Sequence, residues 1–576
     1  MTARVLGLSG SLAEVAPLPN AALYELVRVG TSGLLGEVVR VAGETATVQV
    51  YEDTTGLAVG EPVAATGRPL TLHLGPGLLG SVLDGVGRPL GRIAEITGDF
   101  LQPGVTAPTL DAERRWDFAP VTTRGSAVAP GDVLGTVEER PGLTHAILVP
   151  PTLRGTLAEV RAGALTIADT LARLEDGTTL TLAQEWPVRE PRPSSRRLPA
   201  SDPFITGQRV FDFLFPVAEG GSVAVPGGFG TGKTVIEQSL AKYGAADVVV
   251  YVGCGERGNE MAEVLQEFPR LQDPRTGRSI MDRSVLVVNT SNMPVAAREA
   301  SVFVGMTIAE YYRDMGYRVA VMADSLSRWA EALREIGARL QEMPGEEGYP
   351  TYLGNRLGKF YARAGRVEAL GAPRRTGAVT LISAVSPPGG DFSEPVTQAS
   401  LRVAGALWAL DPALAHQRQF PAVDWETSYS LHADALADWF ARHAGADWSE
   451  LRRDTLALMQ RDRELRDIAG LVGPEALQDR DRLLLDAARV LRETVLGQSA
   501  YDPNDAYSPL EKTYRLAALA HALYRAGLAA LDRGLPIERI DLGPAQRALA
   551  AARRAAGPEF AERAAVVEGA IRTVGS

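Results

Sequence analysis

One eight-residue segment constrains the fold of this chain more than any other. It consists of Gly227, Gly228, Phe229, Gly230, Thr231, Gly232, Lys233 and Thr234, and matches the phosphate-loop pattern GxxxxGK[ST]. In such a loop the backbone N–H groups turn inward on phosphates, the lysine reaches the β- and γ-phosphates, and the threonine hydroxyl ligates Mg²⁺. The loop requires a buried strand before it and a helix after it, and residues 223–225 and 234–243 have the sequences for both.

The alternative for this segment is a chance glycine-rich turn, since the chain contains 59 glycines. Lysine, however, is scarce: only four of the 59 basic residues are lysine, and one of them is Lys233. That scarcity favours a nucleotide site.

Apolar runs alternate with helical segments between residues 200 and 430. Candidate buried strands lie at 223–225, 248–252, 285–288, 319–323 and 379–382, which predicts a parallel α/β sheet. Parallel strands open their carboxyl ends on one edge. Asp324 follows strand 319–323 in the Walker-B position, where a carboxylate supports Mg²⁺, and Glu256 follows strand 248–252, where a carboxylate orients attacking water. The alternatives are a helix cap for Asp324 and a solvated loop for Glu256.

The rest of the chain predicts further domains, so the fold class is multidomain α/β. Within residues 1–72, the stretch 44–51 alternates polar and apolar side chains and glycine turns recur around it, which indicates a small closed β-barrel. Residues 73–110 connect it to the core, and the β-rich region 111–199 ends in a Pro-rich stretch, 191–197, typical of a linker. We expect this region to be removable without unfolding the nucleotide domain, 200–430. Residues 431–576 show helical periodicity.

Composition excludes several classes of protein. The net charge of −11 disfavours a surface that coats nucleic acid, and the single cysteine, Cys254, excludes an intrachain disulfide. The six histidines form no zinc motif. No apolar run reaches the ~18 residues that span a bilayer, so we expect a soluble chain.

Together these motifs resemble the catalytic A subunit of the V-type/A-type rotary ATPases, over nearly the whole length. The resemblance also rests on residues 253–261, 291–301, 324–332, 343–350, 386–395 and 421–430. It identifies region 111–199 as the bulge insertion of A subunits, and residues 471–481 as a helix-turn-helix that faces the central rotor. The sequence departs from common relatives at Gly228, Thr231 and Leu326, and at Thr231 it lacks the cysteine of eukaryotic vacuolar subunits.

The resemblance implies a role for each site residue. Glu256 is the catalytic carboxylate, assisted by Lys233 and Arg257. Thr234 binds Mg²⁺, which Glu260 and Asp324 hold through water. Nucleotide binding is implied for Gly227, Gly228, Phe229, Gly230, Thr231, Gly232, Lys233, Thr234 and Val235, with Phe420 and Tyr501 on either side of the adenine.

The implied activity is Mg²⁺-dependent hydrolysis or synthesis of ATP, with ATP and ADP as substrates. The implied partners are a non-catalytic B subunit in an alternating hexamer, central rotor subunits, peripheral stalk subunits and, indirectly, a membrane sector. The expected location is the cytoplasmic face of a membrane. Which direction of the reaction dominates, and whether H⁺ or Na⁺ is moved, stay open.

Other classes remain as alternatives. The β subunit of F-type synthases and the export ATPases lack the bulge insertion, and the intact loop excludes the non-catalytic B subunit. A hexameric nucleic-acid motor shares the α/β core, but its barrel would carry a basic, aromatic face that residues 1–72 lack. A non-enzymatic nucleotide-binding scaffold is disfavoured by Glu256.

Overall fold

A computed structural model describes residues 2–98 and 102–575. Residues 99–101, which fall within the predicted connector, lie outside the described part. The chain forms two compact units. Unit 1 comprises the chain up to residue 199 together with residues 246–387 and 391–403, and unit 2 comprises residues 200–245, 388–390 and 404 onward. Each unit is described separately.

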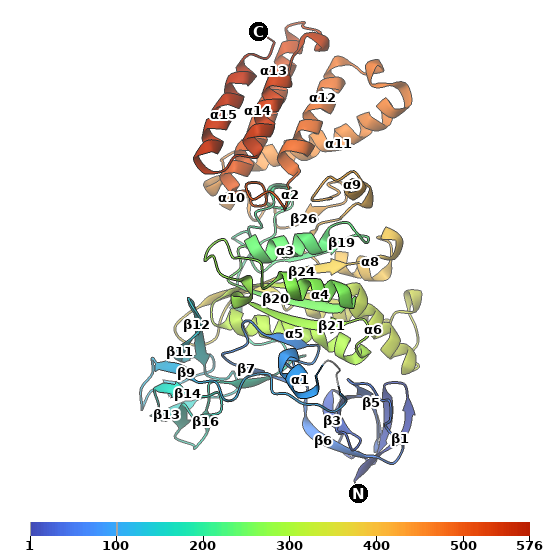
Figure 1. Cartoon of the computed structure of the whole chain (residues 1–576), viewed down its shortest axis with the longest axis vertical. Coiled ribbons are helices and arrows are strands. Elements are labelled where there is room, and N and C mark those ends of the chain that lie inside the picture. The colour runs from blue at the N-terminus through green and yellow to red at the C-terminus, as the bar shows by residue number, and fades with distance from the viewer. Residues whose placement is uncertain (1, 99–101, 576) are drawn as a thin grey trace. The chain divides into compact units, whose positions relative to one another are not determined.

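The N-terminus of unit 1 is a closed barrel, as predicted (Figure 1). Its strands run in the order β1-β2-β5-β4-β3-β6. In β5, the side chains of Ala46 and Val48 point inward and are buried, as the period-two pattern requires. The strands are β1 (Ala3–Ser9), β2 (Leu12–Ala16), β3 (Glu25–Val29), β4 (Leu34–Ala42), β5 (Thr45–Val50) and β6 (Pro62–Pro69).

The region 111–199 is β-structure with a core of its own, which includes Trp116 and Phe118. One sheet has the order β12-β11-β9-β14 and a second has the order β10-β13-β15-β16. The strands are β9 (Trp116–Pro120), β10 (Ala127–Val128), β11 (Val133–Arg140), β12 (Leu143–Leu148), β13 (Gly155–Val160), β14 (Gly163–Leu165), β15 (Ala172–Leu174) and β16 (Thr179–Leu180). A later strand, β17 (Gln184–Pro187), pairs with β7 (Thr71–Leu74).

The central sheet of unit 1 is parallel in the order β24-β22-β20-β21-β8. Its strands are β24 (Thr376–Val385), β22 (Arg318–Asp324), β20 (Val248–Glu256), β21 (Ser284–Thr290) and β8 (Val82–Asp84). Four of them contain predicted runs, whereas β8 comes from the connector and was not predicted. Helices α1 (Leu90–Thr97), α4 (Gly258–Glu267), α5 (Val295–Asp314), α6 (Leu326–Arg339), α7 (Leu353–Tyr361) and α8 (Pro395–Leu401) complete this unit, with β18 (Arg196–Arg197) and β23 (Gly365–Glu368).

The bulge region is tied to α5 by buried polar side chains. Glu139 accepts hydrogen bonds from His145 Nδ1 at 2.7 Å and from the hydroxyl of Tyr312 at 3.0 Å, and the hydroxyl of Tyr311 contacts His145 Nε2 at 2.9 Å. The side chains of His145 and Glu139 are almost completely buried. Removing the region would expose this face of α5, so these contacts argue against folding of the nucleotide domain without it, which stays a prediction.

The stretch 191–197 is likewise not a free linker. The guanidinium of Arg192 is buried and donates from Nε to Asp314 at 2.7 Å, while its backbone N–H donates to Glu310. Arg196 and Arg197 form β18, which pairs with β23. The Pro-rich composition predicted a linker, but acidic residues on α5 provide partners for Arg192.

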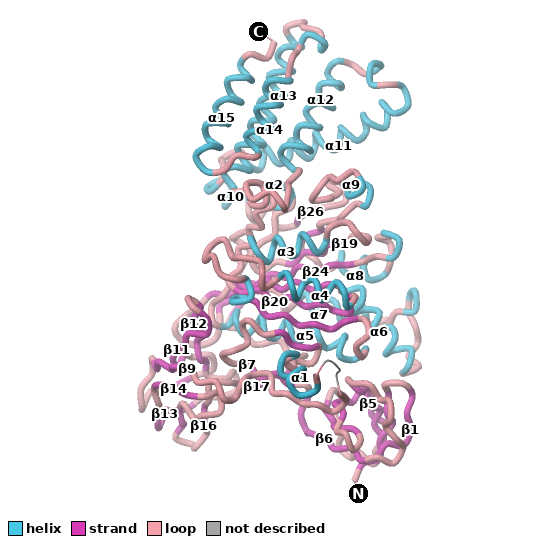
Figure 2. The backbone as a smooth tube through the Cα atoms, in the orientation of Figure 1, coloured by secondary structure: helices cyan, strands magenta, loops and turns pink. Residues whose placement is uncertain are grey.

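Unit 2 contains β19 (Ser222–Pro226), which pairs in parallel with β25 (Ala406–Leu407), and β26 (Tyr429–Ser430), which pairs antiparallel with β25. Helices α2 (Arg209–Leu214), α3 (Lys233–Tyr243) and α9 (Pro412–His416) accompany them. Beyond β26 the described chain is helical, as predicted (Figure 2). The helices are α10 (Ala437–His443), α11 (Trp448–Val472), α12 (Asp479–Val490), a π-helical turn (Leu491–Leu496), α13 (Leu510–Asp532), α14 (Gly543–Arg553) and α15 (Gly557–Arg572).

Two features of the helices bear on function. Helices α11 and α12, joined by a short 3-10 turn, form the helix-turn-helix predicted at residues 471–481. Across residues 2–98 and 102–575, none of the helices combines the length and apolar character needed to cross a membrane.

Candidate nucleotide-binding site

The phosphate loop of unit 2 lies between β19 and α3, in the context its sequence predicts. Gly230 and Gly232 have φ of 76° and 90°, a backbone conformation that favours glycine. A Cβ added at Gly227 would lie 2.7 Å from Thr231 Oγ1, closer than real Cβ atoms approach. These three positions therefore need glycine because of backbone shape and close packing.

The side chains of the loop make contacts within it. Lys233 Nζ donates hydrogen bonds to the carbonyl oxygens of Gly227 at 2.6 Å and Gly228 at 3.0 Å. Thr231 Oγ1 donates to the carbonyl of Gly228 at 2.9 Å. Lys233 begins α3, so its ammonium group and the helix N-terminus are both next to the turn that would hold phosphate.

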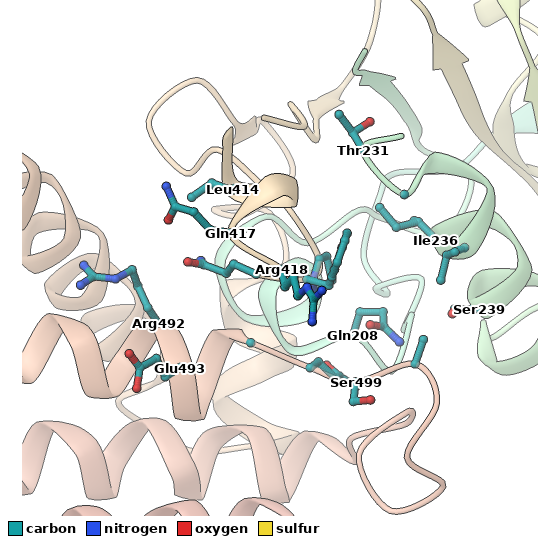
Figure 3. A pocket seen from close by; sticks show the side chains of 18 of the residues that line it. Gln208, Thr231, Ile236, Ser239, Leu414, Gln417, Arg418, Arg492, Glu493 and Ser499 are labelled. Atoms are coloured by element: carbon teal, nitrogen blue, oxygen red, sulfur yellow. The ribbon is translucent and has the colours of Figure 1, made fainter. Parts of the chain in front are cut away.

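A pocket of about 610 Å³ lies beside the loop within unit 2. Figure 3 shows it between the start of α3 and the C-terminal helices. Its lining includes the loop residues Thr231 and Gly232, Val235 of α3, and both predicted base-stacking aromatics, Phe420 and Tyr501. Tyr501 is 88% exposed and Phe420 43% exposed. Plain core packing, the alternative for these aromatics, does not fit such exposure.

The predicted carboxylates lie together in unit 1. Glu256 is the last residue of β20, and Asp324 is the last residue of the neighbouring β22, where it pairs with Gly253. Glu260 lies in the first turn of α4, the helix that begins two residues after Glu256. Burial, the charge of Asp324 and a hydrogen bond with Glu260 raise the pKa of Glu256 to about 8. Such crowded carboxylates are stabilised by a bound cation.

Two arginines approach the same strand ends. A Cβ at Gly255, where φ is 75°, would lie 2.8 Å from Arg298 Cδ and 2.8 Å from Arg328 Cβ. Arg298, on α5, is 8% exposed, and its Nη2 donates to the carbonyl of Ser291 at 2.9 Å. Arg328 contacts Glu331 at 3.0 Å. Both residues lie within segments of the family resemblance, but their spacing alone did not single them out.

Arg257 is exposed and forms the N-cap position of α4, next to Glu256. The described residues contain no cluster of three or more His, Cys, Asp or Glu side chains arranged to hold a metal ion. Carboxylate and hydroxyl oxygens nevertheless suit Mg²⁺, which keeps several water ligands and commonly binds substrate phosphates.

Models of four protein families match successive parts of the chain. The "ATP synthase alpha/beta family, beta-barrel domain" matches residues 6–67, and the "ATPsynthase alpha/beta subunit barrel-sandwich domain" matches residues 107–189. The "ATP synthase alpha/beta family, nucleotide-binding domain" matches residues 207–430. The "C-terminal domain of V and A type ATP synthase" matches residues 437–540.

Named relatives cover almost the whole chain. The V-type ATP synthase alpha chain of Anaeromyxobacter dehalogenans is 57% identical over 550 residues, which is 95% of each chain. The A subunit of the A-type ATP synthase of Methanopyrus kandleri is 53% identical over 542 residues, 93% of this chain and 91% of that one. Among solved structures, the assembled ATPase EscN of the enteropathogenic E. coli type III secretion system matches with a TM-score of 0.65 at 21% identity. The match covers 90% of this chain and 99% of that chain, so the two share a fold. This chain therefore belongs to the family formed by the alpha chains of V-type ATP synthases and the A subunits of A-type ATP synthases.

Proposed function

We propose that this chain is the catalytic subunit of a rotary V/A-type ATPase or ATP synthase, which couples ATP hydrolysis or synthesis to ion movement across a membrane. The observation that carries the proposal is 57% identity over 95% of the chain with a V-type ATP synthase alpha chain, combined with an intact phosphate loop. The family model for the V and A type C-terminal domain favours this function over an F-type β subunit or an export ATPase.

Within unit 2, the loop residues 227–235 hold the phosphates. The ammonium group of Lys233 neutralises their charge and the hydroxyl of Thr234 is a ligand for Mg²⁺. The rings of Phe420 and Tyr501 stack on the base, and the pocket they share with Gly232 supports that role.

Within unit 1, Glu256 orients and polarises the water that attacks the γ-phosphate. Arg257 stabilises the charge that develops on the transferred phosphoryl group, and Glu260 and Asp324 hold Mg²⁺ through water. Bound there, the ion would supply a positive charge that favours the ionised form of Glu256, against the burial and the charge of Asp324 that raise its pKa to about 8.

The working assembly is a ring of three such chains alternating with three non-catalytic B subunits, with active sites at the interfaces. The helix-turn-helix of α11 and α12 faces the central rotor, and peripheral stalk subunits hold the ring stationary. The complex is attached to the cytoplasmic face of a membrane, and nucleic acid is not a partner.

The test is Mg²⁺-dependent ATP hydrolysis by the chain assembled with its non-catalytic partner, with ring formation verified by mass. Hydrolysis that needs both subunits and stops when Mg²⁺ is chelated is expected. A verified ring that binds no nucleotide, or that hydrolyses ATP equally well without Mg²⁺, would contradict the proposal.

A further inference from the structure

The pocket beside the phosphate loop extends beyond what the base of one nucleotide occupies. Lys233 and Thr234, which serve the phosphates, are not part of its wall, so its 610 Å³ lies on the base side of the loop. Figure 3 shows Arg492 and Glu493 across the pocket from Thr231 and Ile236. Among the residues that the structure describes, Glu493 is the only acidic one in the wall, whereas five arginines contribute to it: Arg418, Arg466, Arg489, Arg492 and Arg553.

Buried carboxylates do not match these arginines one for one. Arg466 and Arg492 both contact Asp462, a buried side chain on α11. Arg553 shares the buried carboxylate of Asp505 with Arg209. Four guanidinium groups thus share two carboxylates, which leaves a net positive charge at this end of the pocket.

Of the remaining arginines in the wall, Arg418 adds to that charge, whereas two surface carboxylates offset the charge of Arg489. Arg418 is exposed, and no hydrogen bond or ion pair of its side chain occurs within the described ranges, 2–98 and 102–575. Arg489 contacts Asp486 at 3.2 Å and Glu493 at 3.9 Å, both at the surface. Behind the wall, burial and the charge of Arg209 lower the pKa of Lys512 to about 8, as expected in an electropositive region.

We propose that this arginine-lined end of the pocket binds the phosphoryl groups of a second small ligand, next to the base of the bound nucleotide. Guanidinium groups have a planar, forked geometry that matches phosphate oxygens and are only weakly hydrated. Four different elements supply Arg466, Arg489, Arg492 and Arg553, namely α11, α12, the π-helical turn and α14, so the ligand would also brace these helices against one another.

A small anion fits better than a polymer. The arginines are gathered in one pocket, whereas the chain as a whole carries a net charge of −11, which repels an extended polyanion. The inference rests on the proposed function only for the position of the base. The arginines and the carboxylates that they share are seen in unit 2, whatever the chain does.

The experiment measures the binding of tripolyphosphate to the full chain by titration calorimetry, in the absence of Mg²⁺. Lys233→Ala removes phosphate binding at the loop, so that the remaining binding reports the arginines. In that background, Arg466→Gln with Arg489→Gln removes two guanidinium groups that are 48% and 46% exposed, and whose loss leaves the helical core in place. Arg461→Gln with Arg563→Gln is the matched control, since both are paired, exposed arginines on C-terminal helices outside the pocket.

We expect the Lys233→Ala chain to bind tripolyphosphate, and the pocket pair of substitutions to weaken binding at least about tenfold. The control pair of substitutions should change the affinity for tripolyphosphate less than twofold. Equal binding by all three variants, or no binding by Lys233→Ala, would overturn the second anion site. Failure of a verified ring of this chain and its B partner to bind Mg-ADP would instead overturn the proposed function, so the two failures are distinguishable.

Discussion

The ammonium group of Lys233 donates a hydrogen bond to the carbonyl oxygen of Gly227 at 2.6 Å, within the loop that its own side chain serves. A nucleotide must replace this contact with contacts to phosphate. Lys233→Arg keeps the charge, but the planar guanidinium is too bulky for a turn shaped around a compact ammonium group. We expect at least about tenfold weaker binding of a fluorescent ATP analogue. Lys242→Arg, on the same helix, is the control, and normal binding by Lys233→Arg would contradict the assignment of the loop.

Glu256→Gln should retain nucleotide binding and lose turnover. Glutamine has nearly the same shape, but its neutral amide cannot polarise the attacking water as a carboxylate does. We expect hydrolysis by the assembled ring to fall at least ~10²-fold, whereas Glu263→Gln, an exposed position on α4, should leave it unchanged. Turnover within threefold of the unmodified ring would remove Glu256 from the catalytic role.

The strands and the loop could be predicted from sequence because their signals are local. The runs at 248–252 and 319–323 became β20 and β22, and the loop lies between β19 and α3 as its pattern requires. Strand β8 was missed because only three residues pair with β21, and their neighbours show no periodicity. Arg298 and Arg328 were missed as well, since what brings them to Gly255 is the packing of α5 and α6 and not their spacing in the sequence.

The buried arginine at the junction of the bulge and α5 gives a prediction about stability. Arg192→Gln removes a guanidinium that is 1% exposed and contacts Asp314 at 2.7 Å. We expect the free energy of unfolding to fall by about 3 kcal/mol. This is the lower end for breaking a buried ion pair, because Arg313 still contacts Asp314. Denaturant unfolding and hydrogen exchange in α5 measure the effect. Arg196→Gln, an exposed position in β18, is the control, and equal stability of the two variants would show that Arg192 does not anchor the bulge.

His521 makes the stability of the helical domain depend on pH. Its side chain is buried, and the Thr455 hydroxyl, which donates to the carbonyl of Leu451, accepts a hydrogen bond from His521 Nε2 at 2.8 Å. Burial lowers the pKa of His521 to about 4. Because this pKa lies below the unfolded value of about 6.5, the neutral histidine stabilises the fold fully above pH 6.5, and that contribution is lost as pH falls toward 4.

The part of the stability loss on acidification that comes from His521 should be absent in a variant without the imidazole. Between pH 7.5 and pH 5 we expect the helical domain to lose about 2 kcal/mol of stability through this group. His521→Gln keeps a hydrogen-bond donor but does not titrate, so its stability should fall less over the same range. His443→Gln, at an exposed position on α10, should behave like the unmodified chain. An identical pH dependence in His521→Gln would exclude this histidine as the cause.

The purified chain alone should be a poor ATPase. Its own proposed cations are Lys233, Arg257 and Mg²⁺, and the family resemblance assigns a further arginine to the neighbouring B subunit. An arginine supplied in trans contributes ~10³–10⁵ in rate, or about 4–7 kcal/mol of transition-state stabilisation. In the proposed alternating ring, each interface would open or close separately, so that a rotor would impose different affinities on chemically identical sites. When the chain is titrated with its B partner, turnover should rise with ring formation and fall when the partner's arginine is replaced by alanine. Full activity in a verified monomer would refute both the trans arginine and the ring mechanism.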